Sequence, residues 1–148
     1  ARKLMKKRLT LAVAESCTGG LLSSTLTDVP GSSKWFKGGV VAYTNEVKIS
    51  ILGVKTATLK KYGAVSEETA FELAKGVRKK LKTNIGVSVT GLAGPSGGTK
   101  ETPVGTVFIG IDDGKETLVK KLKLAGSRIK IKKDAVGLAI KMLQKFIK

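Results

Sequence analysis

The chain has 148 residues, 41% of them hydrophobic, which is enough to bury a core and suits one domain over residues 1–148. Its formal net charge of +17 indicates either an anionic partner, such as a phosphorylated substrate or a nucleic acid, or a solvated lysine-rich surface. It contains no histidine and one cysteine, Cys17, which excludes a Ser-His-Asp triad, a Cys-His dyad and an intrachain disulfide.

Several features are missing from the sequence, and their absence bears on where the protein is located and what it binds. No apolar run approaches the roughly 20 residues of a membrane-spanning helix, and no signal peptide is visible, so we expect a cytoplasmic protein with no membrane partner. Without histidine, a zinc site would depend on Cys17 and carboxylates, so we expect no metal and no cofactor. Only four basic residues are arginine and seven residues are aromatic, so we expect no specific nucleic-acid partner.

Strands and helices alternate in the first third of the chain. Residues 9–15 predict a buried strand, which ends in the turn 16–20 and is followed by a helix over 21–28. Residues 39–43 predict a second strand. The next helix should have Asn45 as its N-cap and end at Gly53. Its apolar positions are Val47, Ile51 and Leu52.

Two further helices are predicted before the third strand. Residues 56–62 predict a short helix that ends at Gly63. Ser66 should cap a longer helix, whose acidic first turn and basic last turn both suit the helix dipole. Its apolar stripe has a period of 3.6 residues and consists of Ala70, Leu73, Ala74, Val77 and Leu81.

The last third of the chain predicts a strand, a hairpin and a long helix. Residues 85–89 predict a buried strand that leads into the glycine-rich loop 90–98. Residues 104–111 and 117–124 predict a hairpin, and the final helix should begin near Ser127. Alternating helices and strands closed by a hairpin predict an α/β fold with three layers, α/β/α, around a mixed, mainly parallel sheet.

Ser16 is the first candidate for chemistry. It follows a predicted strand and precedes Gly19, Gly20 and a helix, at the sheet edge where α/β proteins bind ligands. A hydroxyl at this turn could act as a nucleophile, and the backbone N–H groups near Thr18, Gly19 and Gly20 could stabilise an oxyanion. The alternative is an ordinary strand–helix turn in which Ser16 only caps the helix.

Lys48 and Tyr43 form the second candidate, at the end of the second predicted strand. If this strand ends at the same edge as the first, both side chains can reach toward Ser16. Burial and the helix dipole would lower the pKa of Lys48, and a neutral lysine can activate a serine without histidine. The alternative is a surface lysine beside a tyrosine packed in the core.

A glycine-rich loop and a scarce arginine complete the set of candidates. Residues 90–98 carry four glycines after a buried strand and could form an anion-binding nest, although they match neither a P-loop nor a dinucleotide fingerprint. Arg128 opens the last predicted helix, and its guanidinium suits a phosphate or a carboxylate. The alternatives are a flexible surface loop and an arginine on a solvated helix face.

Together these motifs resemble the C-terminal domain of the competence/damage-inducible CinA family, in the stand-alone form without the family's second domain. The resemblance covers nearly the whole chain. The matching segments are residues 14–20 (AESCTGG), 38–48 (GGVVAYTNEVK), 63–68 (GAVSEE), 90–98 (TGLAGPSGG), 103–107 (PVGTV) and the region of Ser127 and Arg128.

The resemblance implies an activity and assigns roles to the candidate residues. Active members of the family hydrolyse the carboxamide of nicotinamide mononucleotide, which gives nicotinic acid mononucleotide and ammonia. The resemblance makes Ser16 the nucleophile, Lys48 its general base and Tyr43 their support. It also implies that Arg128 holds the phosphate and that the pocket is lined by Thr90 and the loop residues Gly91, Ala93 and Gly94.

Two other functions are consistent with the sequence. A nucleotide-binding or regulatory module would keep the pocket without turnover, and ammonia release distinguishes it from an enzyme. A basic nucleic-acid-binding protein would show a steep dependence of binding on salt. A homodimer is a further expectation, because closed symmetry is common among small enzymes.

Overall fold

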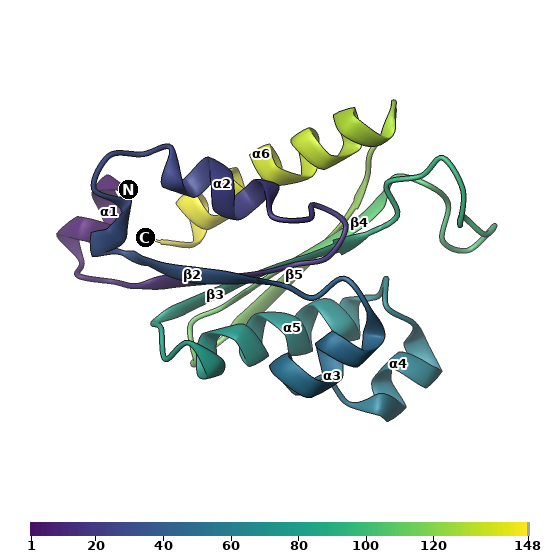
Figure 1. Cartoon of the computed structure of the whole chain (residues 1–148), viewed down its shortest axis with the longest axis horizontal. Coiled ribbons are helices and arrows are strands. Elements are labelled where there is room, and N and C mark those ends of the chain that lie inside the picture. Colours follow the sequence, from purple (N-terminus) through teal and green to yellow (C-terminus); the bar gives the residue numbers. More distant parts are fainter. Residues whose placement is uncertain (148) are drawn as a thin grey trace.

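The computed structural model describes residues 1–147, in which a five-stranded sheet carries helices on both faces (Figure 1). Its elements, in chain order, are α1 (Arg2–Lys6), β1 (Leu11–Glu15), α2 (Leu21–Thr27), the short 3₁₀ helix η1 (Ser32–Lys34), β2 (Phe36–Val41), α3 (Asn45–Leu52), α4 (Thr56–Tyr62), α5 (Glu67–Lys80), β3 (Ile85–Gly91), β4 (Thr106–Asp112), β5 (Thr117–Lys123) and α6 (Arg128–Phe146).

The strand order in the sheet is β2-β1-β3-β4-β5. β1 is parallel to both of its neighbours, β2 and β3, whereas β4 is antiparallel to β3 and to β5. β5 therefore runs in the same direction as the first three strands, and β4 alone is reversed. The predicted fold class, a mixed and mainly parallel sheet in an α/β/α arrangement, is confirmed. The carboxyl ends of β1, β2 and β3 share one edge of the sheet.

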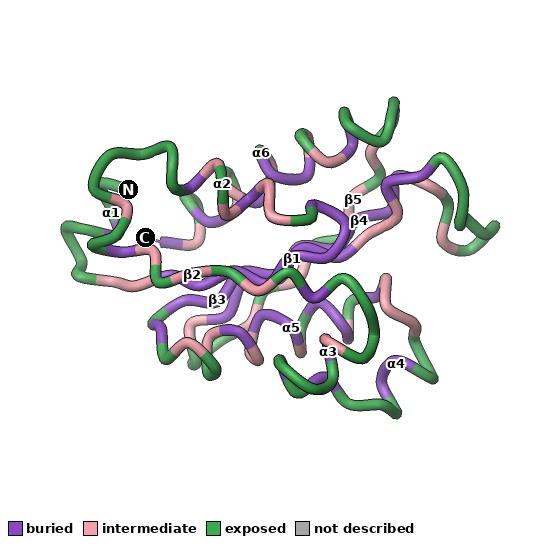
Figure 2. Tube along the Cα trace, viewed as in Figure 1, coloured by how far each residue is buried: buried purple, intermediate pink, exposed green. Residues whose placement is uncertain are grey.

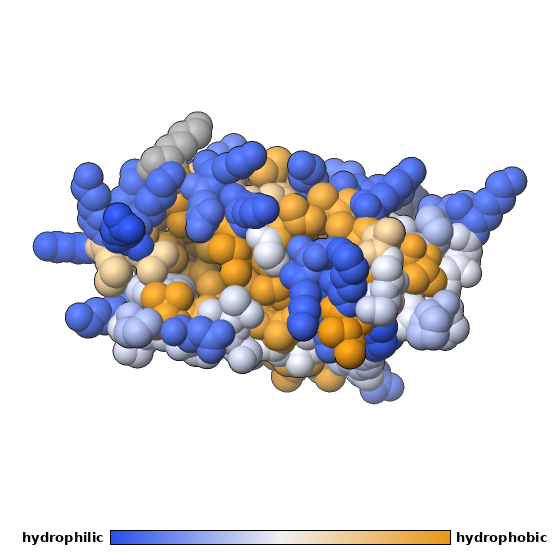
Figure 3. Space-filling model, turned by 90° about the horizontal axis from the view of Figure 1, so that it is seen from above, coloured by the Kyte–Doolittle hydropathy of each residue, from blue (hydrophilic) through white to orange (hydrophobic). Residues whose placement is uncertain are grey.

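Two hydrophobic clusters hold the three layers together. α1, α2 and α6 cover one face of the sheet, and α3, α4 and α5 cover the other (Figure 1). Side chains of β1 alternate between the clusters: Leu11 and Val13 pack toward α2 and α6, and Ala12 and Ala14 pack toward α5. β1, β3 and β4 are buried along most of their length (Figure 2). On the face that carries α2 and α6, apolar side chains reach the surface among hydrophilic ones (Figure 3).

Small residues bring α5 close to the sheet. A Cβ atom added to Gly86 of β3 would lie 2.2 Å from the carbonyl oxygen of Ala74, and one added to Gly110 of β4 would lie 2.7 Å from that of Ala70. Neither strand position could carry a side chain without moving the helix. α5 is thereby fixed across the sheet, and the segments at its N-terminal end are held near the edge where the parallel strands end.

The second strand and the helix after it differ from the predictions. β2 covers Phe36–Val41 rather than 39–43, because this edge strand alternates between half-buried and exposed residues and gives only a weak apolar signal. The N-cap of α3 is Thr44 rather than Asn45, since the side chain of Thr44 accepts a hydrogen bond from the Val47 N–H. Ile51 is exposed.

Smaller differences concern the ends of other elements. α1 and η1 were not predicted, because short helices with few buried residues have too little periodicity. β3 extends to Gly91, which pairs with Val107, so the loop after it is shorter than predicted. None of the helices among residues 1–147 is both long and apolar enough to cross a bilayer.

Candidate active site

Backbone hydrogen bonds hold Ser16 between two strands at the shared sheet edge. Its N–H donates to the carbonyl oxygen of Val89 in β3 at 2.9 Å, and the Ala42 N–H donates to the carbonyl oxygen of Glu15 at 2.8 Å. The parallel hydrogen-bond pattern of the sheet thus continues one residue beyond the ends of β1 and β2. Ser16 and the segment after β2 therefore lie side by side, as the sequence predicted for two strands that end at one edge.

Lys48 reaches Ser16 from the helix that follows β2. Its Nζ atom lies 3.2 Å from Ser16 Oγ, and the whole residue is only 1% exposed. The same Nζ donates to the carbonyl oxygen of Ala42 at 2.8 Å and lies 3.4 Å from that of Tyr43. A neutral amine has two N–H bonds and one lone pair, so the two carbonyl groups can take both hydrogens and leave the lone pair for the serine hydroxyl.

The surroundings of Lys48 favour its neutral form. Burial lowers its pKa, and the nearby Cys17 has a smaller, opposite effect. Among residues 1–147, no carboxylate forms an ion pair with Lys48. Of the two glutamates near it in sequence, Glu46 is exposed, and the carboxylate of Glu15 accepts a hydrogen bond from the N–H of Leu22. Lys48 is therefore suited to take a proton from Ser16.

Glu15 is buried directly before the nucleophile candidate, and it organises the turn after β1. One carboxylate oxygen accepts hydrogen bonds from Thr18 Oγ1 and from the N–H groups of Gly20 and Leu22, at 2.6, 3.1 and 2.9 Å. The other accepts from the N–H and the hydroxyl of Ser23, at 2.8 and 2.7 Å. The carboxylate occupies the positive N-terminal end of α2, a role that sequence analysis did not assign.

This carboxylate changes the assignment of oxyanion donors. The N–H of Gly20 is taken by Glu15, and that of Gly19 donates to the carbonyl oxygen of Ser16 at 3.1 Å. Within the described chain, the N–H groups of Cys17 and Thr18 donate to no backbone carbonyl oxygen and to no side chain of another residue. Cys17 lines the cavity, so its N–H is the candidate oxyanion donor, whereas Thr18 is fully buried outside the cavity lining. The N–H groups of Gly19 and Gly20, which the sequence suggested as donors, already have partners within the turn.

Replacing Glu15 with glutamine is expected to lower the free energy of unfolding by about 2 kcal/mol, because an amide nitrogen would face N–H groups that now donate to a carboxylate oxygen. Urea denaturation measures this change. Glu116→Gln is the matched control, since Glu116 is exposed, and its substitution should change stability by less than about 0.5 kcal/mol. Equal stability of the Glu15 variant and the wild type would contradict this role.

A cavity of about 300 Å³ opens beside the Ser16–Lys48 pair. It contains most of the predicted pocket residues, but Thr18, Gly19 and Gly20 do not line it. Thr90 is fully buried in its wall, where its hydroxyl donates to the carbonyl oxygen of Ala64 at 2.8 Å. The lining residues are Ser16, Cys17, Tyr43, Asn45, Lys48, Ala64, Val65, Thr90, Gly91, Leu92, Ala93, Gly94, Ser96 and Arg128.

Arg128 bridges the mouth of this cavity. One guanidinium nitrogen donates to the carbonyl oxygen of Gly94 at 2.6 Å, and another donates to the hydroxyl of Tyr43 at 3.0 Å. Tyr43 is 57% exposed and does not pack in the core. Its carbonyl group faces Lys48, whereas its ring extends to Arg128. Among residues 1–147, no carboxylate pairs with Arg128, so its charge is available to an anion.

Cys17 lies in the same cavity wall but is a poor nucleophile. Burial raises the pKa of its thiol to about 11, despite a smaller opposite effect of nearby cations. At neutral pH it is a thiol rather than the reactive thiolate. Of the two adjacent residues, Ser16 is therefore the better candidate for a nucleophile.

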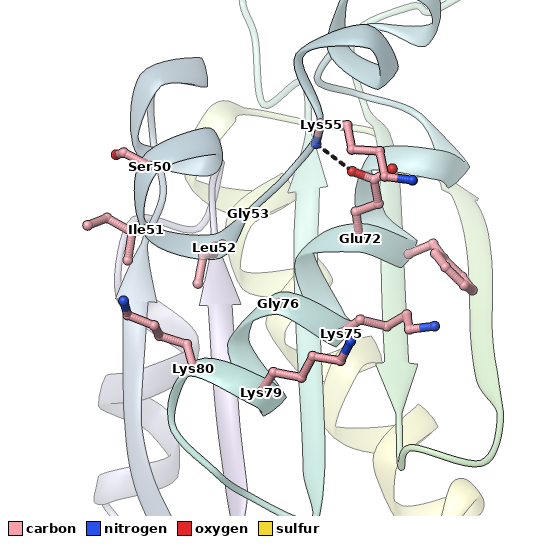
Figure 4. Close-up of a pocket in the computed structure, with 11 residues that line it drawn as sticks. Ser50, Ile51, Leu52, Gly53, Lys55, Glu72, Lys75, Gly76, Lys79 and Lys80 are labelled. Carbon is pink, nitrogen blue, oxygen red and sulfur yellow. Dashed lines mark hydrogen bonds between the residues drawn. The ribbon is translucent and has the colours of Figure 1, made fainter.

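A larger hollow of about 630 Å³ lies between α3 and α5 (Figure 4), and neither Ser16 nor Lys48 lines it. Lys75, Lys79 and Lys80 extend along it from α5. Its carboxylate, Glu72, already accepts hydrogen bonds from the Lys55 N–H and Thr58 Oγ1, at 2.7 and 2.6 Å. The smaller cavity, with a serine beside a buried lysine, is therefore the candidate active site.

Comparisons with known proteins show the family of the chain. The family model of the CinA C-terminal domain matches residues 1–147. A putative competence-damage inducible protein of Acetivibrio thermocellus is 52% identical over 99% of this chain and 36% of its own length. One from Halothermothrix orenii is 58% identical over 86% of this chain and 32% of its own length. The chain thus spans about a third of these curated relatives.

Solved structures of similar length share the fold. A competence/damage-inducible protein of Agrobacterium tumefaciens superimposes with a TM-score of 0.96 at 38% identity, over 99% of this chain and 90% of that one. A protein of the CinA superfamily from Escherichia coli gives a TM-score of 0.95 at 33% identity, over 98% of this chain and 84% of that one.

Proposed function

Because the chain belongs to the CinA C-terminal domain family, we propose that it is an amidohydrolase that converts nicotinamide mononucleotide into nicotinic acid mononucleotide and ammonia. The observation that carries the proposal is the contact of 3.2 Å between Lys48 Nζ and Ser16 Oγ in a chain without histidine. A serine paired with a buried lysine is suited to acyl transfer from an amide.

The reaction begins with the serine. Neutral Lys48 accepts the hydroxyl proton while Ser16 Oγ attacks the carboxamide carbon. The resulting oxyanion is stabilised by the N–H group of Cys17, a residue that lines the cavity. Lys48 then returns the proton to the leaving nitrogen, so that ammonia departs and an acyl-enzyme ester remains. The positive charge of the pyridinium ring makes the carboxamide carbon more electrophilic and assists the attack.

Water completes the cycle. Lys48, neutral again, accepts a proton from a water molecule that attacks the ester carbonyl group. The tetrahedral intermediate collapses, Ser16 regains its proton from Lys48, and the carboxylic acid that forms releases its own proton to solvent. Nicotinic acid mononucleotide thus leaves with a carboxylate in place of the amide. One water is consumed and one ammonia is released per turnover.

A panel of amides tests the proposal. Ammonia release is measured with nicotinamide mononucleotide, nicotinamide riboside, free nicotinamide, and glutamine as an unrelated amide. We expect the mononucleotide to react fastest and glutamine not to react. Binding of the mononucleotide without ammonia release would instead identify a nucleotide-binding module of the same fold.

Nicotinamide riboside, which lacks the phosphate, is expected to have a kcat/KM lower by about ten- to a hundredfold. The reason is the loss of a charge-assisted contact to Arg128, which is worth about 1.5–3 kcal/mol. Steady-state kinetics with both compounds measure the ratio. Equal kcat/KM values would exclude a site that recognises the phosphate.

A further inference from the structure

Lys132 lies one helical turn after Arg128 in α6 and on the same helix face. A Cβ atom built on Gly19 would lie 3.8 Å from Lys132 Nζ, so the ammonium group stands over the loop that follows Ser16. Arg128 lines the cavity, and Lys132 lies outside its lining, beside the loop that follows Ser16. Sequence analysis gave no role to Lys132.

The charge of Lys132 is not neutralised by the protein. Over residues 1–147, its Nζ forms no hydrogen bond and no ion pair, whereas its neighbour Lys130 pairs with Asp134. The buried carboxylate that precedes this loop, Glu15, already accepts hydrogen bonds from groups of the loop and of α2. Both Lys132 and Arg128 act on the Cys17 thiol in the cavity wall, where each lowers its pKa against the larger effect of burial.

Arg128 alone is poorly suited to hold a phosphate. Two of its guanidinium nitrogens already donate to the neutral oxygens of Gly94 and Tyr43, which fix its position. A phosphate monoester carries a charge of about −1.5 to −2 at pH 7, more than one cation compensates. A second cation nearby with free N–H donors would complete the site.

We propose that Lys132 is a second phosphate-binding residue, which together with Arg128 selects phosphorylated over unphosphorylated substrates. The inference rests on the proposed function for its substrate, a nucleoside monophosphate that carries a carboxamide. It adds a determinant of specificity on α6, one turn beyond the residue that the sequence motif suggested. The ammonium group binds the phosphate oxygens from the side of Gly19, and the guanidinium group binds them from the side of the glycine-rich loop.

Kinetics of Lys132→Ala test the assignment. The ratio of kcat/KM for nicotinamide mononucleotide to that for the riboside should fall about tenfold, mainly through a higher KM for the mononucleotide. Lys132→Arg should restore most of the ratio. Lys133→Ala is the matched control, because Lys133 is exposed on another side of α6 and its replacement removes the same net charge. An unchanged ratio in Lys132→Ala, or an equal fall in Lys133→Ala, would overturn the assignment.

Direct binding separates this inference from the proposed function. If the wild type releases no ammonia from either compound, the deamidase proposal fails, and inorganic phosphate becomes the probe. Its dissociation constant, from titration followed by NMR, should rise about tenfold in Lys132→Ala and stay unchanged in Lys133→Ala. Equal affinity of both variants would then reject the phosphate site as well.

Discussion

Replacing Ser16 with alanine is expected to reduce ammonia release from nicotinamide mononucleotide by at least about a thousandfold, because no other group in the cavity supplies an activated nucleophile. The fold should remain intact. The backbone N–H of Ser16 would still bind Val89, and only the contact between its hydroxyl and Lys48 would be lost. The rate is measured with purified protein whose melting temperature is checked in parallel.

Cys17→Ala is the control for this experiment. Cys17 is adjacent to Ser16 and lines the same cavity, but its pKa of about 11 keeps the thiol protonated at neutral pH. Its replacement should lower the rate by less than about tenfold, through packing alone. If Ser16→Ala kept its activity and Cys17→Ala lost it, the cysteine would be the nucleophile.

Lys48→Arg is expected to reduce turnover by about a hundred- to ten-thousandfold, the range for the loss of a general base. Arginine keeps the positive charge but does not release its proton at any pH the protein tolerates. Lys48→Met, which has a similar shape and no charge, should be as inactive. Steady-state ammonia release measures both variants.

Lys61→Arg is the control for replacing a lysine with an arginine. Lys61 is exposed on α4, so this substitution should cause no loss of activity. A thermal melt of each Lys48 variant shows whether the larger side chain has disturbed the fold. Turnover close to that of the wild type in a folded Lys48→Arg protein would mean that Lys48 is not the base.

Much of the fold follows from local sequence signals. The bounds of α4 match the prediction, and the predicted cap of α5, Ser66, accepts a hydrogen bond from the Thr69 N–H. These elements carry strong periodicity or clear start and stop residues. β2 lacks them, since two glycines lie inside it and only one side of it is partly covered. Apolar patterning also misplaced part of the buried face of α3, because Lys48 is buried there beside the predicted Leu52, whereas Ile51 is exposed.

The parts of the candidate site that lie at the ends of strands were predicted from the sequence. The parts that depend on how the layers pack against each other were not. Parallel strands bring Ser16 and the segment of Lys48 to one edge, so their proximity follows from topology. The role of Glu15 depends on how the chain turns back over its carboxylate, which no spacing rule predicts. The position of Lys132 depends on how α6 crosses the loop after Ser16. Ala64 and Val65, in the segment before α5, also line the cavity.

The pH dependence of kcat/KM for ammonia release tests the central claim, that a buried neutral Lys48 activates Ser16. Burial lowers the pKa of Lys48, so the fraction in the active, neutral form should increase as the pH rises through that value. We expect kcat/KM of the wild type to rise along one limb with an apparent pKa below the value of about 10.4 for a lysine in water. That limb should be missing from Lys48→Arg. A wild type that releases no ammonia at any pH, or a Lys48→Arg protein with the same limb, would contradict the claim.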